Sequence, residues 1–112
     1  MKIAPESIKA LESKRYLNVQ EVFEVLQRNN GIVWSWAARS YTQVPEKALM
    51  FRVSGYKFKG NVMISLNFMD YFDVEFFSVR GVKKHEITDI CGYDGLIRAI
   101  DEYVEKQPDY IY

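Results

Sequence analysis

A single histidine, His85, lies among charged residues in the segment KKHEITD. A histidine beside carboxylates such as Glu86 and Asp89 can act as a general base or bind a metal ion. Zinc normally takes several His or Cys ligands, whereas this chain has one histidine and one cysteine. A lone histidine among exposed charges is far more often a solvated side chain. We therefore predict no catalytic or metal-binding role for His85.

Two further groups of residues could support hydrolysis or nucleophilic catalysis. Asp70, Asp73 and Glu75 cluster in MDYFDVE, but alternating acidic residues are also typical of the solvent side of a half-exposed strand. Cys91 precedes the last predicted helix, where a thiol pKa can fall, yet no spacing rule places His85 beside it as a base. The glycines form no phosphate-binding loop. We therefore predict a protein that is not an enzyme and that has no cofactor.

Composition predicts one ordinary globular domain. The chain has 112 residues, of which 48% are hydrophobic and 27% charged. We expect a single domain over 1–112, with 107–112 as a loose tail. The fifteen basic residues equal the fifteen acidic ones, so any attraction for phosphates must come from a local patch. The single cysteine, and the lack of an apolar run long enough for a signal peptide or a membrane span, predict a soluble cytoplasmic protein with no membrane partner.

Helical patterns occur toward both ends of the sequence. Pro5 begins a short one that contains Ile8 and Leu11. In NVQEVFEVLQRNNG, Asn18 and Glu21 have the spacing of a capping box, and Gly31 is placed to end the helix in a left-handed conformation. The last helix is predicted in GLIRAIDEYVEK, where apolar residues recur at the helical period.

The segments between these helices alternate like β-strands. The first predicted strand, over 32–39, places Trp34 and Trp36 on the same face, more simply in the core than on an open platform. A turn is expected at 41–46, followed by strands over 47–58, 61–68 and 73–79. Lys59-Gly60-Asn61 is a hairpin signal, and 82–90 is either a short extra strand or a connection.

Short connections between the strands indicate antiparallel pairing. The predicted fold is therefore α+β: an antiparallel sheet of four to five strands with helices on one face, in the order α-α-β-β-β-β-α. The face expected to meet the helices consists of Leu49, Phe51, Val53, Val62, Ile64, Leu66, Val74 and Phe76.

The opposite face is the candidate interaction surface. Its candidate contact residues are Met50, Arg52, Met63 and Phe77, which are more apolar than a solvent-facing strand usually carries. We predict a small non-enzymatic protein-interaction module that pairs with itself, or with another protein, through this face or an edge strand. The alternative is a single-stranded nucleic-acid-binding protein that uses the same face, with aromatic rings stacking on bases and with phosphate contacts from Arg39, Arg52, Lys57 and Lys59.

Several runs along the chain resemble those of a known group of proteins. VWSWAARSY, FRVSG, KGNVMISL, FDVEFF and LIRAIDEYVE together resemble a group of short single-domain bacterial proteins, often associated with mobile elements, that have no assigned activity. The resemblance covers 31–105. It implies a bacterial origin and supplies no catalytic motif.

Overall fold

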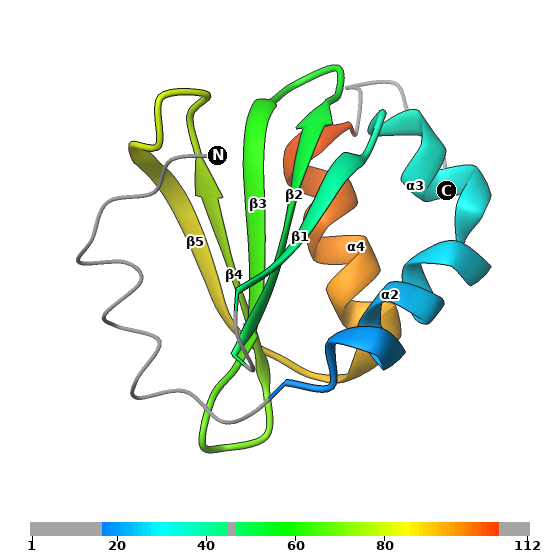
Figure 1. Ribbon diagram of the computed structural model, residues 1–112, viewed down its shortest axis with the longest axis vertical. Helices are drawn as coiled ribbons and strands as arrows, with labels where there is room; N and C mark the ends of the chain where they lie inside the picture. The colour runs from blue at the N-terminus through cyan, green and yellow to red at the C-terminus, as the bar shows by residue number, and fades with distance from the viewer. Residues whose placement is uncertain (1–16, 45–46, 106–112) are drawn as a thin grey trace.

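The computed structural model describes residues 17–44 and 47–105 as an α+β fold with a five-stranded sheet (Figure 1). The expected helix around Ile8 and the expected tail at 107–112 lie outside these ranges. The elements, in chain order, are α2 (Val19–Arg28), α3 (Asn30–Ser35), β1 (Arg39–Val44), β2 (Ala48–Ser54), β3 (Lys59–Leu66), β4 (Phe72–Phe77), β5 (Lys83–Ile90) and α4 (Gly92–Val104).

The sheet is a simple antiparallel meander in the order β1-β2-β3-β4-β5. Met50 lies opposite Met63, which lies opposite Glu75, so the central strands keep one register across the sheet. The segment left open as a strand or a connection forms β5 and pairs with β4. Strictly sequential pairing confirms the α+β class and the antiparallel sheet.

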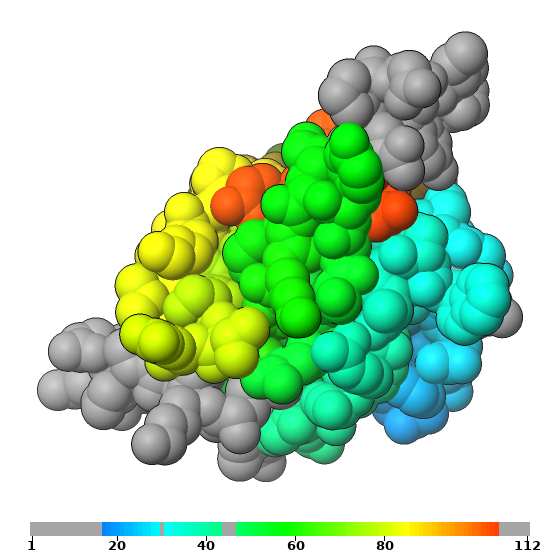
Figure 2. All heavy atoms as spheres, turned by 90° about the horizontal axis from the view of Figure 1, so that it is seen from above, coloured from blue at the N-terminus to red at the C-terminus, as the bar shows by residue number. Residues whose placement is uncertain are grey.

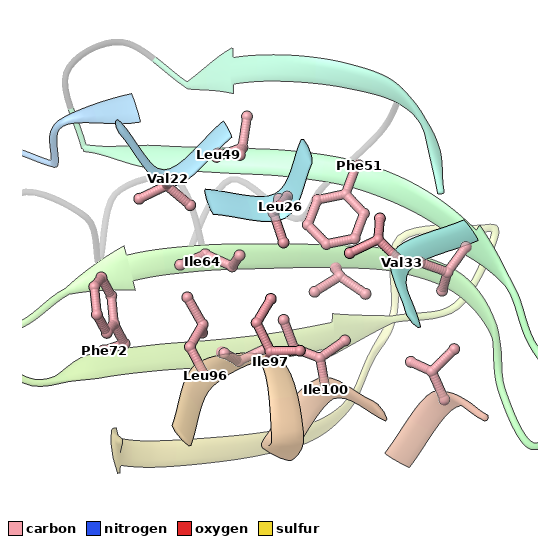
Figure 3. Close-up of a cluster of buried hydrophobic side chains, with 14 of the residues drawn as sticks. Val22, Leu26, Val33, Leu49, Phe51, Ile64, Phe72, Leu96, Ile97 and Ile100 are labelled. Carbon is pink, nitrogen blue, oxygen red and sulfur yellow. The ribbon is translucent and has the colours of Figure 1, made fainter. Parts of the chain in front are cut away.

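The helices pack on the predicted face of the sheet. Leu49, Phe51 and Ile64 meet Val22 and Leu26 of α2 and the apolar stripe of α4, as Figure 3 shows. Asn18 caps α2 as the sequence predicted, since its side-chain oxygen accepts a hydrogen bond from the Glu21 amide at 3.1 Å. The cap and the two amphipathic helices thus fix one side of the sheet.

The predicted strand over 32–39 is wrong. Residues 30–35 form α3, and the strand β1 begins only at Arg39 and continues through 41–44, which were expected to form a turn. Val33 and Trp36, three residues apart, point into the core, whereas Trp34 is 82% exposed. Gly31 lies inside α3, and the backbone turns instead at Ala37, which has a φ of 51°. The apolar spacing fits a helix as well as a strand, and the helix lets Val33 and Trp36 enter the core together.

The hairpin expected at Lys59-Gly60-Asn61 is also displaced. These residues lie within β3, and the chain reverses earlier, at 55–58. Gly60 is required for packing rather than for turning. A Cβ atom there would overlap the carbonyl oxygen of Phe77 and would lie 2.8 Å from Cζ of Phe58. The glycine therefore marks a close approach of strands.

The meander gives the sheet two distinct ends. We call the end that carries the β2–β3 and β4–β5 turns the upper end, as Figure 1 is oriented. The carboxyl end of α4 also lies there, because the amides of Lys57 and Phe58 donate hydrogen bonds to the carbonyl oxygen of Val104. The lower end carries the β3–β4 turn and the start of α4 (Figure 1).

Candidate functional site

The sheet face away from the helices, which was expected to be open to solvent, buries its apolar side chains. Met50 is 4% exposed, and Met63 and Phe77 are fully buried, forming a second cluster with Ala48. The described helices pack on the opposite face. Strand alternation correctly placed these side chains away from those helices, but the period of two in the sequence says nothing about exposure. The apolar part of the candidate interaction surface is therefore withdrawn from water in this conformation.

Polar side chains on the same face are also buried. Among the residues that the structure describes, the Asn61 Oδ1 and Ser65 Oγ atoms have no hydrogen-bond partner. Glu75 forms an ion pair with Lys83, with 3.3 Å between Oε2 and Nζ. A hydrogen bond to Glu86, at 2.9 Å, raises the pKa of Lys83 against the opposing effect of partial burial. This face is a packed, partly ionic layer.

The acidic cluster in MDYFDVE has a structural role. Asp73 and Glu75 are buried, contrary to the expectation that they lie on a solvent side. The Asp73 Oδ1 atom accepts hydrogen bonds from the amide of Asp89 at 3.0 Å and from the side chain of Asn67 at 3.1 Å. Asp73 thereby holds the irregular pairing of β4 with β5. Across 17–44 and 47–105, no group of three or more His, Cys, Asp or Glu side chains could hold a metal ion.

The basic residues proposed for phosphate contacts gather at the upper end. Arg39 of β1 lies opposite Arg52 of β2, and Lys59 of β3 lies opposite the last residue of β2. Lys57 is in the turn between β2 and β3, and the side chains of Arg39, Lys57 and Lys59 are exposed. Register thus brings together residues that are up to twenty positions apart in the sequence.

Two of these cations, Arg39 and Lys57, donate hydrogen bonds to backbone oxygens. Arg39 Nη1 donates to the carbonyl oxygen of Ala37 at 2.8 Å, and Lys57 Nζ donates to that of Glu102 at 2.7 Å. Among the residues that the structure describes, neither cation forms an ion pair. Their positive charges face solvent in fixed positions.

Two exposed aromatic side chains lie at the same end. Trp34 of α3 is joined to this end because the carbonyl oxygen of Trp36 accepts a hydrogen bond from the amide of Ser54 at 2.7 Å. Tyr56 of the β2–β3 turn is 62% exposed. Figure 2 looks down on the upper end, with the green β2–β3 turn as a ridge beside cyan α3. Tyr56 was missed by the sequence reading, although an aromatic residue beside Lys57 was the available signal.

Charge is divided between the two ends of the sheet. The carboxylates near the upper end include Glu86, which pairs with Lys83, Asp101, which accepts a hydrogen bond from Trp36, and Glu102. Glu105 also lies there and accepts a hydrogen bond from the Tyr56 amide. The lower end carries Lys47 and a larger set of carboxylates: Glu21, Asp70, Asp73, Asp89 and Asp94. The formal net charge of zero therefore conceals a local basic patch.

We use the name basic aromatic end for Trp34, Arg39, Arg52, Tyr56, Lys57 and Lys59.

Within the described part of the chain, no helix is long and apolar enough to cross a membrane. No protein-family model, curated protein or solved structure matches the chain. The resemblance to short bacterial proteins stays a prediction.

Proposed function

We propose that this protein is a non-enzymatic binding module that takes single-stranded nucleic acid at the basic aromatic end. The observation that carries the proposal is that exposed Trp34 and Tyr56 lie at the same end of the sheet as the exposed cations Arg39, Lys57 and Lys59. Aromatic faces stack on unpaired bases, and flanking cations contact the phosphates. The predicted cytoplasmic location and bacterial origin belong to the same proposal.

The balanced net charge does not weaken this patch. β3 has eight residues between the two ends, which is about 25 Å at ~3.3 Å per residue. The Debye length at physiological salt is about 8 Å. Carboxylates at the lower end are therefore screened from a strand bound at the upper end. We expect weak binding with only a modest dependence on salt, because few phosphates are contacted.

Fluorescence anisotropy of a labelled single strand tests the proposal. Stacking is worth about 1–3 kcal/mol per base, so Trp34→Ala should weaken binding by about 5- to 150-fold. Phe68→Ala is the matched control, because Phe68 is an exposed aromatic residue at the lower end. Equal effects of the two substitutions would contradict the proposed surface.

A salt titration tests the phosphate contacts separately. Each contact to a single strand contributes about 0.7 to the slope of log K against log salt. Lys57→Ala combined with Lys59→Ala should therefore reduce the slope by about 1.4. An unchanged slope would show that these lysines do not contact phosphates.

Protein association is the second candidate function. The β3–β4 turn exposes large apolar side chains, with Phe68 67% and Met69 73% exposed. Its shape is fixed, because Asn67 Oδ1 accepts hydrogen bonds from the amides of Met69 and Tyr71. Exposed apolar residues on a rigid turn favour contact with another protein. If the protein associates with itself through this turn, Phe68→Glu should convert the dimer to a monomer, as measured by light scattering.

The sequence predicts association through the sheet face that lies away from the helices. A dimer through Met50, Met63 and Phe77 would require that face to become uncovered, since these side chains are buried. Phe68→Glu distinguishes the two interfaces, because Phe68 is exposed and Phe77 is buried. It should remove a dimer formed through the turn and leave a dimer formed through the sheet face.

A further inference from the structure

A cavity of about 390 Å³ opens between α4 and β5, next to the basic aromatic end. It is lined by Lys57, His85, Ile87, Ala99, Glu102 and Tyr103. Lys57 belongs both to this cavity and to the basic aromatic end, so the two sites are continuous. The volume lies within the range of small-molecule sites, which runs from about 300 to 1,000 Å³.

One wall of the cavity is a stack of aromatic rings. The His85 imidazole lies nearly parallel to the Tyr103 ring, with 4.5 Å between centroids and 10° between planes. The Tyr103 ring in turn packs against the ring of Phe76, with 4.3 Å between centroids, and Phe76 is fully buried. The imidazole therefore has a fixed orientation that is anchored in the core. Fixed aromatic rings are the usual platform for a flat, unsaturated ring system.

The cation at this cavity is also fixed. The hydrogen bond from Lys57 Nζ to the Glu102 carbonyl oxygen ties the β2–β3 turn to the last turn of α4. An ammonium group held beside an aromatic stack matches a ligand that joins a flat ring to a phosphate. Ile87 and Ala99 add apolar surface to the cavity. A second cavity, between α3 and α4, has two carboxylates, Asp94 and Asp101, against one cation, Arg98, and no aromatic ring among its described lining residues. It therefore suits an anionic ring ligand less well than the α4–β5 cavity, which has one carboxylate, Glu102.

We propose that the α4–β5 cavity holds one nucleobase of the bound strand against the His85–Tyr103 stack, with the adjoining phosphate at Lys57. This inference rests on the proposed function and specifies where on the protein a base of the bound strand would be recognised. The exposed rings of Trp34 and Tyr56 would then take neighbouring bases.

The test compares two strands of equal length in anisotropy titrations, one with bases and one abasic. Both carry the same phosphates, so only base contacts separate their affinities. We expect the wild-type protein to favour the strand with bases. His85→Ala should reduce that preference by about 5-fold or more, and should leave the affinity for the abasic strand unchanged. His85→Phe keeps a stacking ring and should restore the preference. An unchanged affinity of His85→Ala for the abasic strand is the readout that separates a base contact from a purely structural role.

Failure of this inference differs from failure of the proposed function. If His85→Ala left the preference intact, the cavity would hold no base, while binding at the basic aromatic end would stand. If neither strand bound, the proposed function itself would fail. In that case a nucleoside monophosphate is titrated while the ring protons of His85, the single histidine, are followed by NMR. A saturable shift would support the cavity as a nucleotide site, and no shift would overturn it.

Discussion

The two tryptophans provide a controlled test of the fold. Trp36 is fully buried, and its Nε1 atom donates a hydrogen bond to Asp101 Oδ1 at 2.9 Å. Asp101 is 1% exposed, so water cannot replace this donor without a local rearrangement. Trp36→Phe removes the donor and leaves most of the aromatic volume. Trp34→Phe makes the same chemical change on a side chain that is 82% exposed.

The expected cost follows from these contacts. A hydrogen bond to a charged group is worth about 1.5–3 kcal/mol, and the smaller ring adds roughly 1 kcal/mol for the incompletely filled space. Trp36→Phe should therefore lower the free energy of unfolding by about 2.5–4 kcal/mol. Trp34→Phe should change it by less than about 0.5 kcal/mol, as exposed substitutions usually do.

Urea denaturation followed by far-ultraviolet circular dichroism measures both values without relying on tryptophan fluorescence. A double-mutant cycle with Asp101→Ala isolates the pair, because the two single costs should not add when the partners share a hydrogen bond. Equal destabilisation by Trp36→Phe and Trp34→Phe would refute the placement of Trp36. Additive costs in the cycle would refute the hydrogen bond.

Three further changes test other parts of the fold by the same measurement. Gly60→Ala should destabilise the protein by at least about 2 kcal/mol, because its Cβ atom would overlap the carbonyl oxygen of Phe77. Ser65→Ala should be neutral or stabilising by up to about 1 kcal/mol, since it removes a buried hydroxyl that has no hydrogen-bond partner within 17–44 and 47–105. Burial, together with the hydrogen bond to Glu21, raises the pKa of Tyr93 from 10.0 to about 12. Because the folded-state pKa is the higher one, the stabilisation by the protonated phenol should be present below pH 10 and should be lost as the pH rises toward 12.

Each of these changes has its own control. Gly31→Ala should stabilise the protein by about 0.4–1 kcal/mol, because Gly31 lies in a helix and an added Cβ atom meets nothing within 4 Å. A loss of stability there would contradict α3. A large cost of Ser65→Ala would reveal a partner for the hydroxyl. In Tyr93→Phe, the part of the alkaline loss that belongs to this residue should disappear.

The central strands and two helices could be predicted because their signals are local. β2, β3 and β4 have alternating apolar residues on a buried face, and α2 and α4 have apolar residues at the helical period. Asn18 added a cap whose geometry follows from the sequence alone. Fold class and the buried face of the sheet followed from these patterns.

The segment 30–44 could not be predicted from local pattern. Its apolar residues satisfy both periods, and only packing decides that Val33 and Trp36 enter the core as a helical pair. The backbone reverses at Ala37 with a φ of 51° and at Ser40 with a φ of 58°, and neither residue type signals a left-handed conformation. Because Pro45 indicates a turn, a turn was expected at 41–46, whereas the residues up to Val44 belong to β1.

Only part of the candidate site could be predicted from the sequence. Arg39, Arg52, Lys57 and Lys59 were selected for a sheet face, yet register places them at one end of the sheet. That register depends on β1, which was misplaced. The burial of Met63 and its neighbours depends on tertiary packing, which alternation does not encode.

The most direct test of the central claim is a two-dimensional ¹H–¹⁵N NMR titration of the full chain with an unlabelled single strand. The two indole N–H signals serve as internal references, because Trp34 is exposed and Trp36 is buried. The account predicts saturable shifts of the Trp34 indole and of the amides of Lys57 and Lys59, and little change at Phe68 in the lower turn. Shifts centred on the lower turn, or no shifts at low salt, would contradict it.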